Sequence, residues 1–238
     1  MELNKIYNVD CLELMRGGDL DSSVDLVLTD PPYEFVNKNP QGWWFMKKEN
    51  KKHLEELNGS FWMTFNPIEL LELSKKVCKK FNWYFFTNKN LLKTYIQRAD
   101  DNKYKRDILL RLKPNPVPIN NWHYLIDKEY IVYIHETWTT FNSKEWYQNY
   151  FTYQSYPIWK REYDHPTVKP KELLLNKIKI SSNEWDLVFD PYMWSWTTAV
   201  ACKELNRNFI GCEINPKYCE IAEKRLSNTM HEQTLFDI

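Results

Sequence analysis

Residues 186–213 predict a strand, a tight loop, a helix and a second strand that ends beside an acidic residue. The first strand ends at Asp190, the helix begins at Thr197, and Glu213 follows the second strand, about twenty residues after Asp190. In a doubly wound α/β sheet, ligands bind at the carboxyl ends of the strands, and an acid at this spacing reaches a ribose diol. The segment therefore predicts a nucleotide-like ligand. The alternative is an ordinary βαβ unit in which the acid has no such role.

Strands and helices alternate along most of the chain. Apolar and β-branched runs predict strands over 6–9, 24–29, 82–87, 106–113, 130–135, 185–189 and 208–212. Capping residues and apolar faces predict helices over 67–81, 90–99, 169–180, 197–205 and 216–226. This alternation predicts a single α/β domain over residues 1–238, with a mostly parallel sheet and helices on both faces.

The composition supports a substantial core and gives no bulk electrostatic signal. The 238 residues are 43% hydrophobic and 16% aromatic, and the formal net charge is zero. A nucleic-acid partner would therefore need a local basic face. Five cysteines without Cys-x-x-Cys spacing and five histidines without metal-ligand spacing predict a reduced, metal-free protein. The sequence shows neither a signal peptide nor an apolar run near 18 residues, so we expect a cytoplasmic protein without a membrane partner.

A second cluster of functional residues ends the predicted strand 24–29. Asp30, Pro31, Pro32 and Tyr33 follow that strand directly. The two prolines stop the strand and stiffen its exit loop. The Asp30 carboxylate and a proline carbonyl can accept both hydrogens of an exocyclic amine, while Tyr33 stacks on a planar base. An ordinary loop is the alternative, because Asp-Pro pairs also punctuate turns. Since Asp30 and Asp190 both follow strands, we expect the two clusters to face one crevice.

These clusters resemble the motifs of DNA amino-methyltransferases that use S-adenosylmethionine. Asp30-Pro31-Pro32-Tyr33 come first, then His165-Pro166-Thr167-Val168-Lys169-Pro170, then the Asp190 loop with Glu213. This order, with the catalytic motif first and the cofactor motif last, is similar to the permuted β-type arrangement of that family, and residues 34–163 match least. The resemblance implies a Rossmann-like methyltransferase fold, base flipping, a frequent homodimer, DNA methylation of the restriction–modification type, and a prokaryotic or phage-type context.

The resemblance also implies roles for residues by their position. Asp30, Pro31, Pro32 and Tyr33 form the expected catalytic cluster, which holds the target amine. The expected contacts to S-adenosylmethionine come from Asp10 and Cys11 near its adenine, Lys169 near its methionine end, Glu213 on its ribose, and Asp190, Tyr192, Ser195, Thr197 and Thr198 in the loop and at the start of the helix. The product would be S-adenosylhomocysteine, and the chemistry needs no metal.

Basic residues close to aromatic residues predict contacts with double-stranded DNA. The candidates are Lys47, Lys48, Lys51 and Lys52 in an expected DNA-contact loop over 34–60, and Arg111 and Lys113 in an expected target-recognition region over 100–163. A solvated loop and simple packing are the alternatives. Near the end of the chain, Gln233-Thr234-Leu235-Phe236 resemble short tails that bind sliding clamps, and the alternative is a frayed terminus.

The cofactor loop departs from the family at two positions. The family pattern is roughly Asp-Pro-Phe-x-Gly-Ser-Gly, and Trp194 and Trp196 stand where it has glycine. Glycine permits a tight turn and close approach to the ligand. A non-glycine residue in the left-handed region costs about 1–2 kcal/mol, and overpacking adds about 1–3 kcal/mol per site. Three interpretations stay open: a reshaped loop with a working pocket, an inactivated but otherwise competent enzyme, or a protein that kept only a binding role.

The leading hypothesis is a site-specific DNA adenine-N6 methyltransferase that Trp194 and Trp196 impair. Its first motif begins with Asp30, which resembles adenine-directed members, whereas cytosine-directed members commonly have serine there. The alternatives are a cytosine-N4 methyltransferase and a catalytically silent DNA-binding relative.

Overall fold

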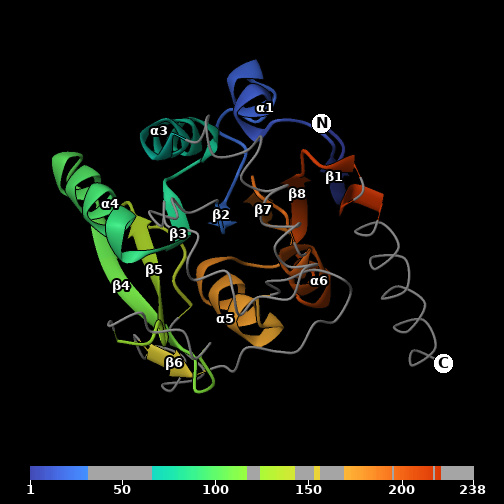
Figure 1. Ribbon diagram of the computed structural model, residues 1–238. Coiled ribbons are helices and arrows are strands. Elements are labelled where there is room, and N and C mark those ends of the chain that lie inside the picture. Colours follow the sequence, from blue (N-terminus) through green and yellow to red (C-terminus); the bar gives the residue numbers. More distant parts are fainter. Residues whose placement is uncertain are drawn as a thin grey trace.

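The computed structural model describes residues 1–31, 66–116, 124–142, 153–155, 169–194, 196–216 and 218–220. Within these residues, eight strands form one sheet in the order β1-β8-β7-β2-β3-β5-β4-β6 (Figure 1). The strands are β1 (Lys5–Tyr7), β2 (Leu26–Thr29), β3 (Asn82–Thr87), β4 (Lys105–Leu112), β5 (Lys128–His135), β6 (Tyr153–Ser155), β7 (Leu187–Asp190) and β8 (Asn208–Cys212). The helices are α1 (Cys11–Gly17), α3 (Pro67–Val77), α4 (Lys89–Asp101), α5 (Lys171–Ser181) and α6 (Thr197–Glu204).

The direction of β5 sets it apart from its neighbours. It runs antiparallel to both β3 and β4, whereas the other pairings in the described sheet are parallel. The prediction of a mostly parallel α/β sheet is confirmed. Because β5 is reversed, its first residues lie at the edge of the sheet where the other strands end. In the register of this hairpin, Arg111 of β4 pairs with Glu129 of β5.

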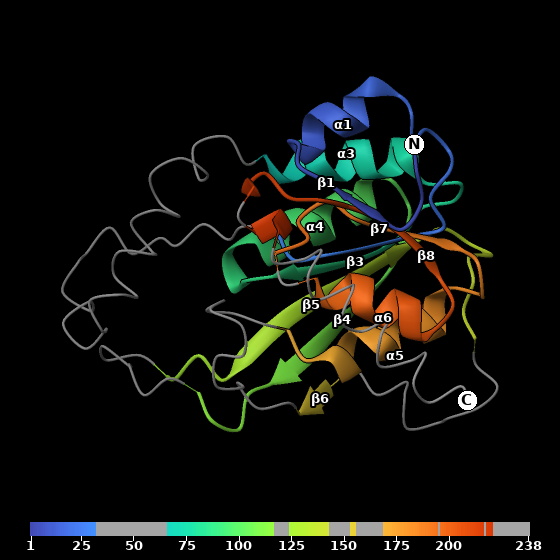
Figure 2. The same cartoon turned by 90° about the vertical axis from the view of Figure 1, so that its right-hand side faces the viewer.

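Helices cover both faces of the sheet, as predicted. Helices α1, α3 and α4 lie on one side, and α5 and α6 lie on the other (Figure 2). The central strands β2, β3 and β7 are buried at every residue, because each face of the sheet packs against a helical layer. Along β7, the side chains alternate between the two cores: Phe189 joins the core under α1, α3 and α4, and Val188 joins the core under α5 and α6.

Short polar side chains cap the starts of three helices. Asn66 caps α3 by accepting hydrogen bonds from the backbone N–H groups of Ile68 and Glu69, and Pro67 occupies the first helical position. Asn88 caps α4 in the same way. Asp10 caps α1, because its Oδ1 accepts a hydrogen bond from the N–H of Leu12 at 2.7 Å. These caps fix the starts of the helices that surround the strand ends.

Several element boundaries differ from the predictions for local reasons. Helix α3 ends at Val77 and does not continue to position 81, because Cys78 has extended backbone angles. Strand β7 begins at Leu187, since Trp185 is 71% exposed and has a φ of 71°, outside the extended region. Helix α5 begins at Lys171, after Pro170.

The predicted DNA-contact loop over 34–60 lies outside the described residues. The predicted target-recognition region over 100–163 supplies β4, β5 and β6 of the sheet. The single-domain assignment and these two regional boundaries stay predictions. In the described part of the chain, every helix is too short or too polar to cross a membrane.

Candidate active site

Two acidic residues meet where the strand order reverses. β2 and β7 are neighbours in the sheet, but the chain continues from β2 to β3 on one side and from β7 to β8 on the other. Such a switch point opens a crevice at the carboxyl ends of the strands. Asp30 follows β2 directly, and Asp190 is the last residue of β7. The sequence therefore places two carboxylates at the point of the fold that favours ligand binding.

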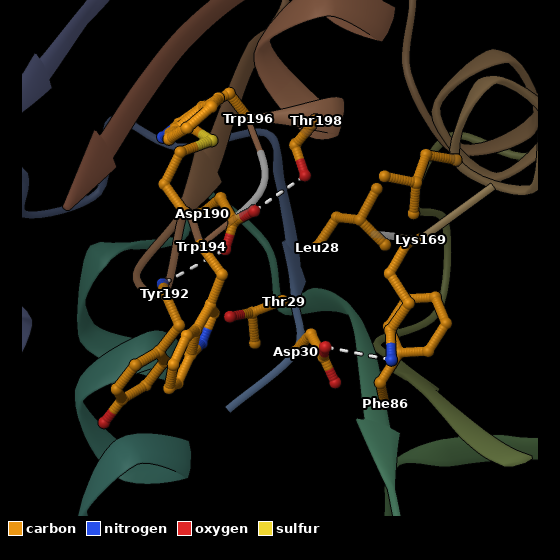
Figure 3. A pocket seen from close by; sticks show the side chains of 12 residues that line it. Leu28, Thr29, Asp30, Phe86, Lys169, Asp190, Tyr192, Trp194, Trp196 and Thr198 are labelled. Atoms are coloured by element: carbon orange, nitrogen blue, oxygen red, sulfur yellow. Dashed lines mark hydrogen bonds and ion pairs between the residues drawn. The ribbon is translucent and has the colours of Figure 1, made fainter. Parts of the chain in front are cut away.

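A small pocket of about 20 Å³, partly open to solvent, lies at this switch point (Figure 3). The expectation that the two clusters face one crevice is confirmed, because Asp30 and Asp190 both line it. The other lining residues are Leu28, Thr29, Phe86, Lys169, Leu174, Tyr192, Met193, Trp194, Trp196 and Thr198.

On the β2 side, Lys169 forms an ion pair with Asp30. The Lys169 Nζ lies 2.9 Å from Asp30 Oδ2 and 2.7 Å from Glu129 Oε1, and it sits 4.8 Å from the centre of the Phe86 ring. Burial alone would lower the pKa of Lys169, but Asp30 and Glu129 together hold this pKa above its usual value. The ammonium group therefore stays charged at neutral pH. Asp30 keeps about a quarter of its side chain exposed, at 23%, so it remains accessible to a ligand.

Glu129 joins this cluster from the reversed strand β5. Its Oε1 accepts a hydrogen bond from Lys169, and its Oε2 accepts one from Arg111 Nη1 at 3.0 Å. Burial would raise the pKa of Glu129, but Lys169 and Arg111 lower this pKa to about 2. The sequence analysis did not single out Glu129. The neighbouring residues carry no signal for this position, because Glu129 reaches the site only through the pairing of β5 with β3 and β4.

Arg111 occupies a different environment from the one that the sequence suggested. Its side chain is 6% exposed and bound to Glu129, so it does not present an exposed basic face for DNA phosphates. The expectation of a surface phosphate contact by Arg111 is corrected on this point. Lys113, just after β4, is partly buried, and burial lowers its pKa. Arg111 therefore acts on the site through its ion pair with Glu129.

On the β7 side, Asp190 is buried and held by the start of α6. Thr198 Oγ1 donates a hydrogen bond to Asp190 Oδ2 at 2.6 Å, and the backbone N–H of Tyr192 donates to Asp190 Oδ1 at 3.1 Å. Burial raises the pKa of Asp190 to about 7. Thr197 and Thr198 form the first turn of α6, as predicted. The N-terminus of this helix favours an anionic group such as a carboxylate.

The predicted adenosine-binding residues gather beside this loop. Glu213 follows β8, its backbone N–H donates to the carbonyl of Tyr7, and its Oε1 accepts from the N–H of Asn215 at 2.8 Å. Burial raises the pKa of Glu213 to about 7. Cys11 begins α1 beside the Tyr192 side chain, and burial raises the pKa of its thiol to about 12, which keeps the thiol neutral.

The two tryptophans of the loop lie in different surroundings. Trp196 has a φ of 51°, in the left-handed region, so this position does have the backbone that glycine adopts most easily. Its side chain is 1% exposed and belongs to the core under α5 and α6. Trp194 is not among the residues with positive φ, which corrects the expectation that both positions need glycine for their backbone angles. Figure 3 shows its ring pointing away from Trp196, on the Tyr192 side of the pocket.

Other predicted site residues lie outside the described part of the chain. These are Pro32, Tyr33, Lys47, Lys48, Lys51, Lys52 and Ser195. Pro31 is described and buried directly after Asp30. Among the described residues, no group of three or more histidine, cysteine, aspartate or glutamate side chains is arranged to hold a metal ion.

The polar groups fit the cofactor that the resemblance implies. An acid follows β8, an anion-favouring helix N-terminus follows β7, and a carboxylate with an exposed edge follows β2. The first two groups match the ribose and the carboxylate of that cofactor. Trp194 and Trp196 line the same space.

Comparisons with known proteins agree with this geometry. The model of the DNA methylase family N6_N4_Mtase matches residues 24–224. The type II methyltransferase M.HpaI of Haemophilus parainfluenzae is 29% identical over 229 residues, which cover 87% of this chain and 69% of that protein. The DNA adenine methyltransferase YhdJ of Escherichia coli is 44% identical over 71 residues, which cover 29% of this chain and 24% of that protein.

A solved structure extends the likeness to nearly the whole chain. The crystal structure of M1.HpyAVI in complex with S-adenosylmethionine is 27% identical, covers 93% of this chain and 98% of its own, and superposes with a TM-score of 0.67. The fold is therefore Rossmann-like, as expected, and the cofactor of the family is S-adenosylmethionine. The chain belongs to the DNA methylase family, the β-class amino-methyltransferases that methylate adenine at N6 or cytosine at N4 in DNA.

Proposed function

We propose that this protein transfers a methyl group from S-adenosylmethionine to the N6 amine of adenine within a specific DNA sequence. The observation that carries the proposal is the position of Asp30, which ends β2 at the pocket, partly exposed and held by Lys169. A carboxylate in this place can accept a hydrogen bond from an amine that enters the pocket from solvent. The target base must first leave the duplex stack, as it does in other enzymes that modify bases.

Asp30 and Pro31 are the proposed amine-binding pair. The amine of adenine is a poor nucleophile because its lone pair is conjugated into the ring. The Asp30 carboxylate and the Pro31 carbonyl accept hydrogen bonds from its two N–H groups and favour a pyramidal nitrogen, whose lone pair is then available for bonding. When bound, S-adenosylmethionine supplies an electrophilic methyl group on a positively charged sulfur. Asp30 takes the proton that the nitrogen releases, and positioning provides much of the acceleration.

The groups on the β7 side are the proposed cofactor site. Glu213 would hold the ribose hydroxyls, and Asp10 and Cys11 would lie near the adenine. The N-terminus of α6, at Thr197 and Thr198, would bind the carboxylate of the methionine end. Asp190 would shape the loop by holding Tyr192 and Thr198, and Ser195 and Tyr192 would complete the loop's contacts.

Adenine is the proposed base for two reasons. The first motif begins with Asp30, which resembles adenine-directed members of the family. One relative with 44% identity over 71 residues is named as a DNA adenine methyltransferase. Cytosine-N4 transfer by the same site is the alternative, because both bases present an exocyclic amine to the same pair of acceptors.

Trp194 and Trp196 are proposed to weaken the binding of S-adenosylmethionine. Trp194 lines the pocket, and Trp196 holds a left-handed backbone at the start of α6, next to the proposed carboxylate site. We expect that replacing both by glycine tightens S-adenosylmethionine binding at least about tenfold, the equivalent of about 1.4 kcal/mol. Unchanged affinity in the double glycine variant would contradict the steric explanation.

DNA is the proposed substrate, and the other expected partners stay predictions. Contacts through Lys47, Lys48, Lys51, Lys52 and Lys113 are testable by the salt dependence of DNA binding. A homodimer is testable by sedimentation, and a sliding-clamp contact through residues 233–236 by deletion of that tail.

The deciding experiment combines binding and product analysis. S-adenosylmethionine is titrated by calorimetry into the wild-type chain and into the double glycine variant, and both proteins are then incubated with genomic DNA and labelled cofactor. Labelled N6-methyladenine supports the proposal, and labelled N4-methylcytosine supports the alternative. DNA binding that is equal with and without cofactor, with no methyl transfer by either protein, would identify a silent DNA-binding relative.

A further inference from the structure

Four charged side chains of alternating sign connect the interior of the sheet to the proposed amine site. Arg111 binds Glu129 at 3.0 Å, Glu129 binds Lys169 at 2.7 Å, and Lys169 binds Asp30 at 2.9 Å. Arg111 belongs to β4 and Glu129 to β5, whereas Lys169 precedes α5 and Asp30 directly follows β2. This charge chain has a formal sum of zero, although Lys169 alone would place a positive charge beside the amine.

All four side chains of the charge chain are largely buried. The side chain of Asp30 is 23% exposed, that of Lys169 is 9%, that of Glu129 is 12%, and that of Arg111 is 6%. Water screens buried charges only weakly, so each charge in the chain interacts strongly with the next one. A buried ion pair is weak evidence for a contribution to stability, because desolvation offsets the attraction. A role in positioning and charge is therefore the more informative explanation for this arrangement.

The geometry of Glu129 suits that role. Its two oxygens are divided between the two cations, with Oε1 on Lys169 and Oε2 on Arg111. This arrangement fixes the rotamer of Glu129 and pulls the Lys169 ammonium to a point between two carboxylates. Glu129 therefore balances part of the positive charge of Lys169, and Lys169 withdraws less of the negative potential at Asp30. The Asp30 carboxylate therefore attracts the amine more strongly as its nitrogen becomes more positive during methyl transfer.

We propose that Glu129 is a positioning residue for methyl transfer: it holds the Lys169 ammonium against Asp30 and balances its charge, and Arg111 holds Glu129 in place. The inference rests on the proposed role of Asp30 as the group that accepts the amine hydrogen. Glu129 does not touch the proposed substrate and acts through Lys169.

The test measures the pKa of Asp30, which depends on all the charged groups that face it. In the described elements these are Lys169 before α5, Glu129 on β5, Arg111 on β4, Lys113 after β4, and Asp190 at the end of β7. The ¹³C carboxyl signal of Asp30, assigned by its loss in Asp30→Asn, is titrated in the wild-type chain and in the variants.

Opposite charge changes must shift the Asp30 pKa in opposite directions. Glu129→Gln removes a negative charge, so the Asp30 pKa falls by about one pH unit. Arg111→Gln removes a positive charge farther away, so the Asp30 pKa rises by a smaller amount. The double variant restores a formal sum of zero and returns the pKa towards the wild-type value. A merely structural role would weaken both single variants without this opposition of sign.

The matched control is Glu204→Gln. It breaks the exposed 2.8 Å ion pair with Lys171, two residues after Lys169, and leaves the Asp30 pKa unchanged. An Asp30 pKa that stays constant in both single variants, or that moves in the same direction in both, overturns the proposal. Should Glu129→Gln not fold, Arg111→Gln alone decides, because an Asp30 pKa that fails to rise there contradicts the charge chain.

Methylation rates separate this inference from the proposed function. Under single-turnover conditions, Glu129→Gln lowers the transfer rate about tenfold and moves the acid limb of its pH profile to lower pH, in step with the Asp30 pKa. A rate that does not change in Glu129→Gln overturns the positioning role. If the Asp30 pKa shifts in opposite directions but neither the wild-type chain nor the double glycine variant transfers methyl groups, Glu129 still sets the charge of Asp30, and the proposed function alone fails.

Discussion

Thr198 ties the first turn of α6 to the end of β7, because its Oγ1 donates a 2.6 Å hydrogen bond to Asp190 Oδ2. The other oxygen of this buried carboxylate accepts from the N–H of Tyr192. The loop between β7 and α6 is therefore anchored at both of its ends to one side chain. This relationship makes the loop conformation depend on a single buried acid.

Thr198→Val should destabilise the protein by about 1–3 kcal/mol, because it leaves one oxygen of Asp190 without its donor inside the core. Urea denaturation at pH 7.5 measures the change in the free energy of unfolding. Thr198→Ser keeps the hydroxyl and serves as the matched control, with a smaller loss. Equal stability of the valine and wild-type proteins would show that the hydrogen bond has no net effect.

The stability of the cofactor-free protein should rise as the pH falls from about 7 towards 5. Burial raises the folded-state pKa of both Asp190 and Glu213 to about 7, above the values near 4 that are usual in unfolded chains. The folded state therefore binds these protons more tightly, and stability is lost as the pH rises through this window. Each group contributes a slope of up to about 1.4 kcal/mol per pH unit. Denaturation curves at pH 5.5 and 7.5 measure the difference.

Glu213→Gln separates the stability and binding roles of this acid. Glutamine retains an oxygen for the N–H of Asn215 but carries no charge, so the pH slope should become shallower and stability at pH 7.5 should increase. Calorimetry should show weaker S-adenosylmethionine binding, by about tenfold, because a charged acceptor on a hydroxyl is replaced by a neutral one. A variant that binds the cofactor as well as the wild type would refute the ribose contact.

The two tryptophans should respond differently to replacement by glycine. Trp194→Gly should provide most of the gain in S-adenosylmethionine affinity at little change in stability, because this side chain lies in the pocket and is only partly buried. Trp196→Gly relieves about 1–2 kcal/mol of left-handed strain, but it empties a core site, which costs about 3–5 kcal/mol. It should therefore lower the free energy of unfolding.

Trp185→Gly is the control for the tryptophan variants. Trp185 also has a positive φ, at 71°, but it is 71% exposed and does not line the pocket. This change should leave cofactor affinity unchanged and stabilise the folded backbone by about 1 kcal/mol. Thermal denaturation and calorimetry on the three single variants test the separation. A gain in affinity from Trp185→Gly would show that the effect is not specific to the pocket.

Asp30→Ala should abolish methyl transfer while sparing cofactor affinity. The loss of the proposed proton acceptor is expected to lower the transfer rate by about 10²–10⁴-fold, whereas the proposed ribose and carboxylate contacts lie on the β7 side. Single-turnover rates and calorimetric titration measure the two effects separately. Turnover close to the wild-type rate would reject the mechanism.

Local patterns in the sequence were sufficient to predict most of the framework. The buried runs that became β2 and β3, the Asn66-Pro67 helix start and the unit around Asp190 each carry their own signal in neighbouring residues. The site at the switch point follows from the same signals, because strand ends determine where Asp30 and Asp190 lie.

The remainder depends on contacts between residues far apart in the chain. The direction of β5 is set by its pairing with β3 and β4, which leaves no local mark on the residues 128–135 themselves. Glu129 was missed and Arg111 was placed outside the site for this one reason. The surroundings of Trp196 were also unpredictable, because its burial depends on how α5 and α6 pack together.

The reversed strand β5 limits how changes in the connection between β4 and β5 affect the charges beside Asp30. Lys113 and Asp127 close the connection between β4 and β5 through a 2.7 Å backbone hydrogen bond, immediately beside the Arg111–Glu129 pair. The segment between them can therefore vary in length and sequence without moving the charges that support Asp30. A hairpin closed in this way keeps the Arg111–Glu129 pair in place whatever residues occupy the connection.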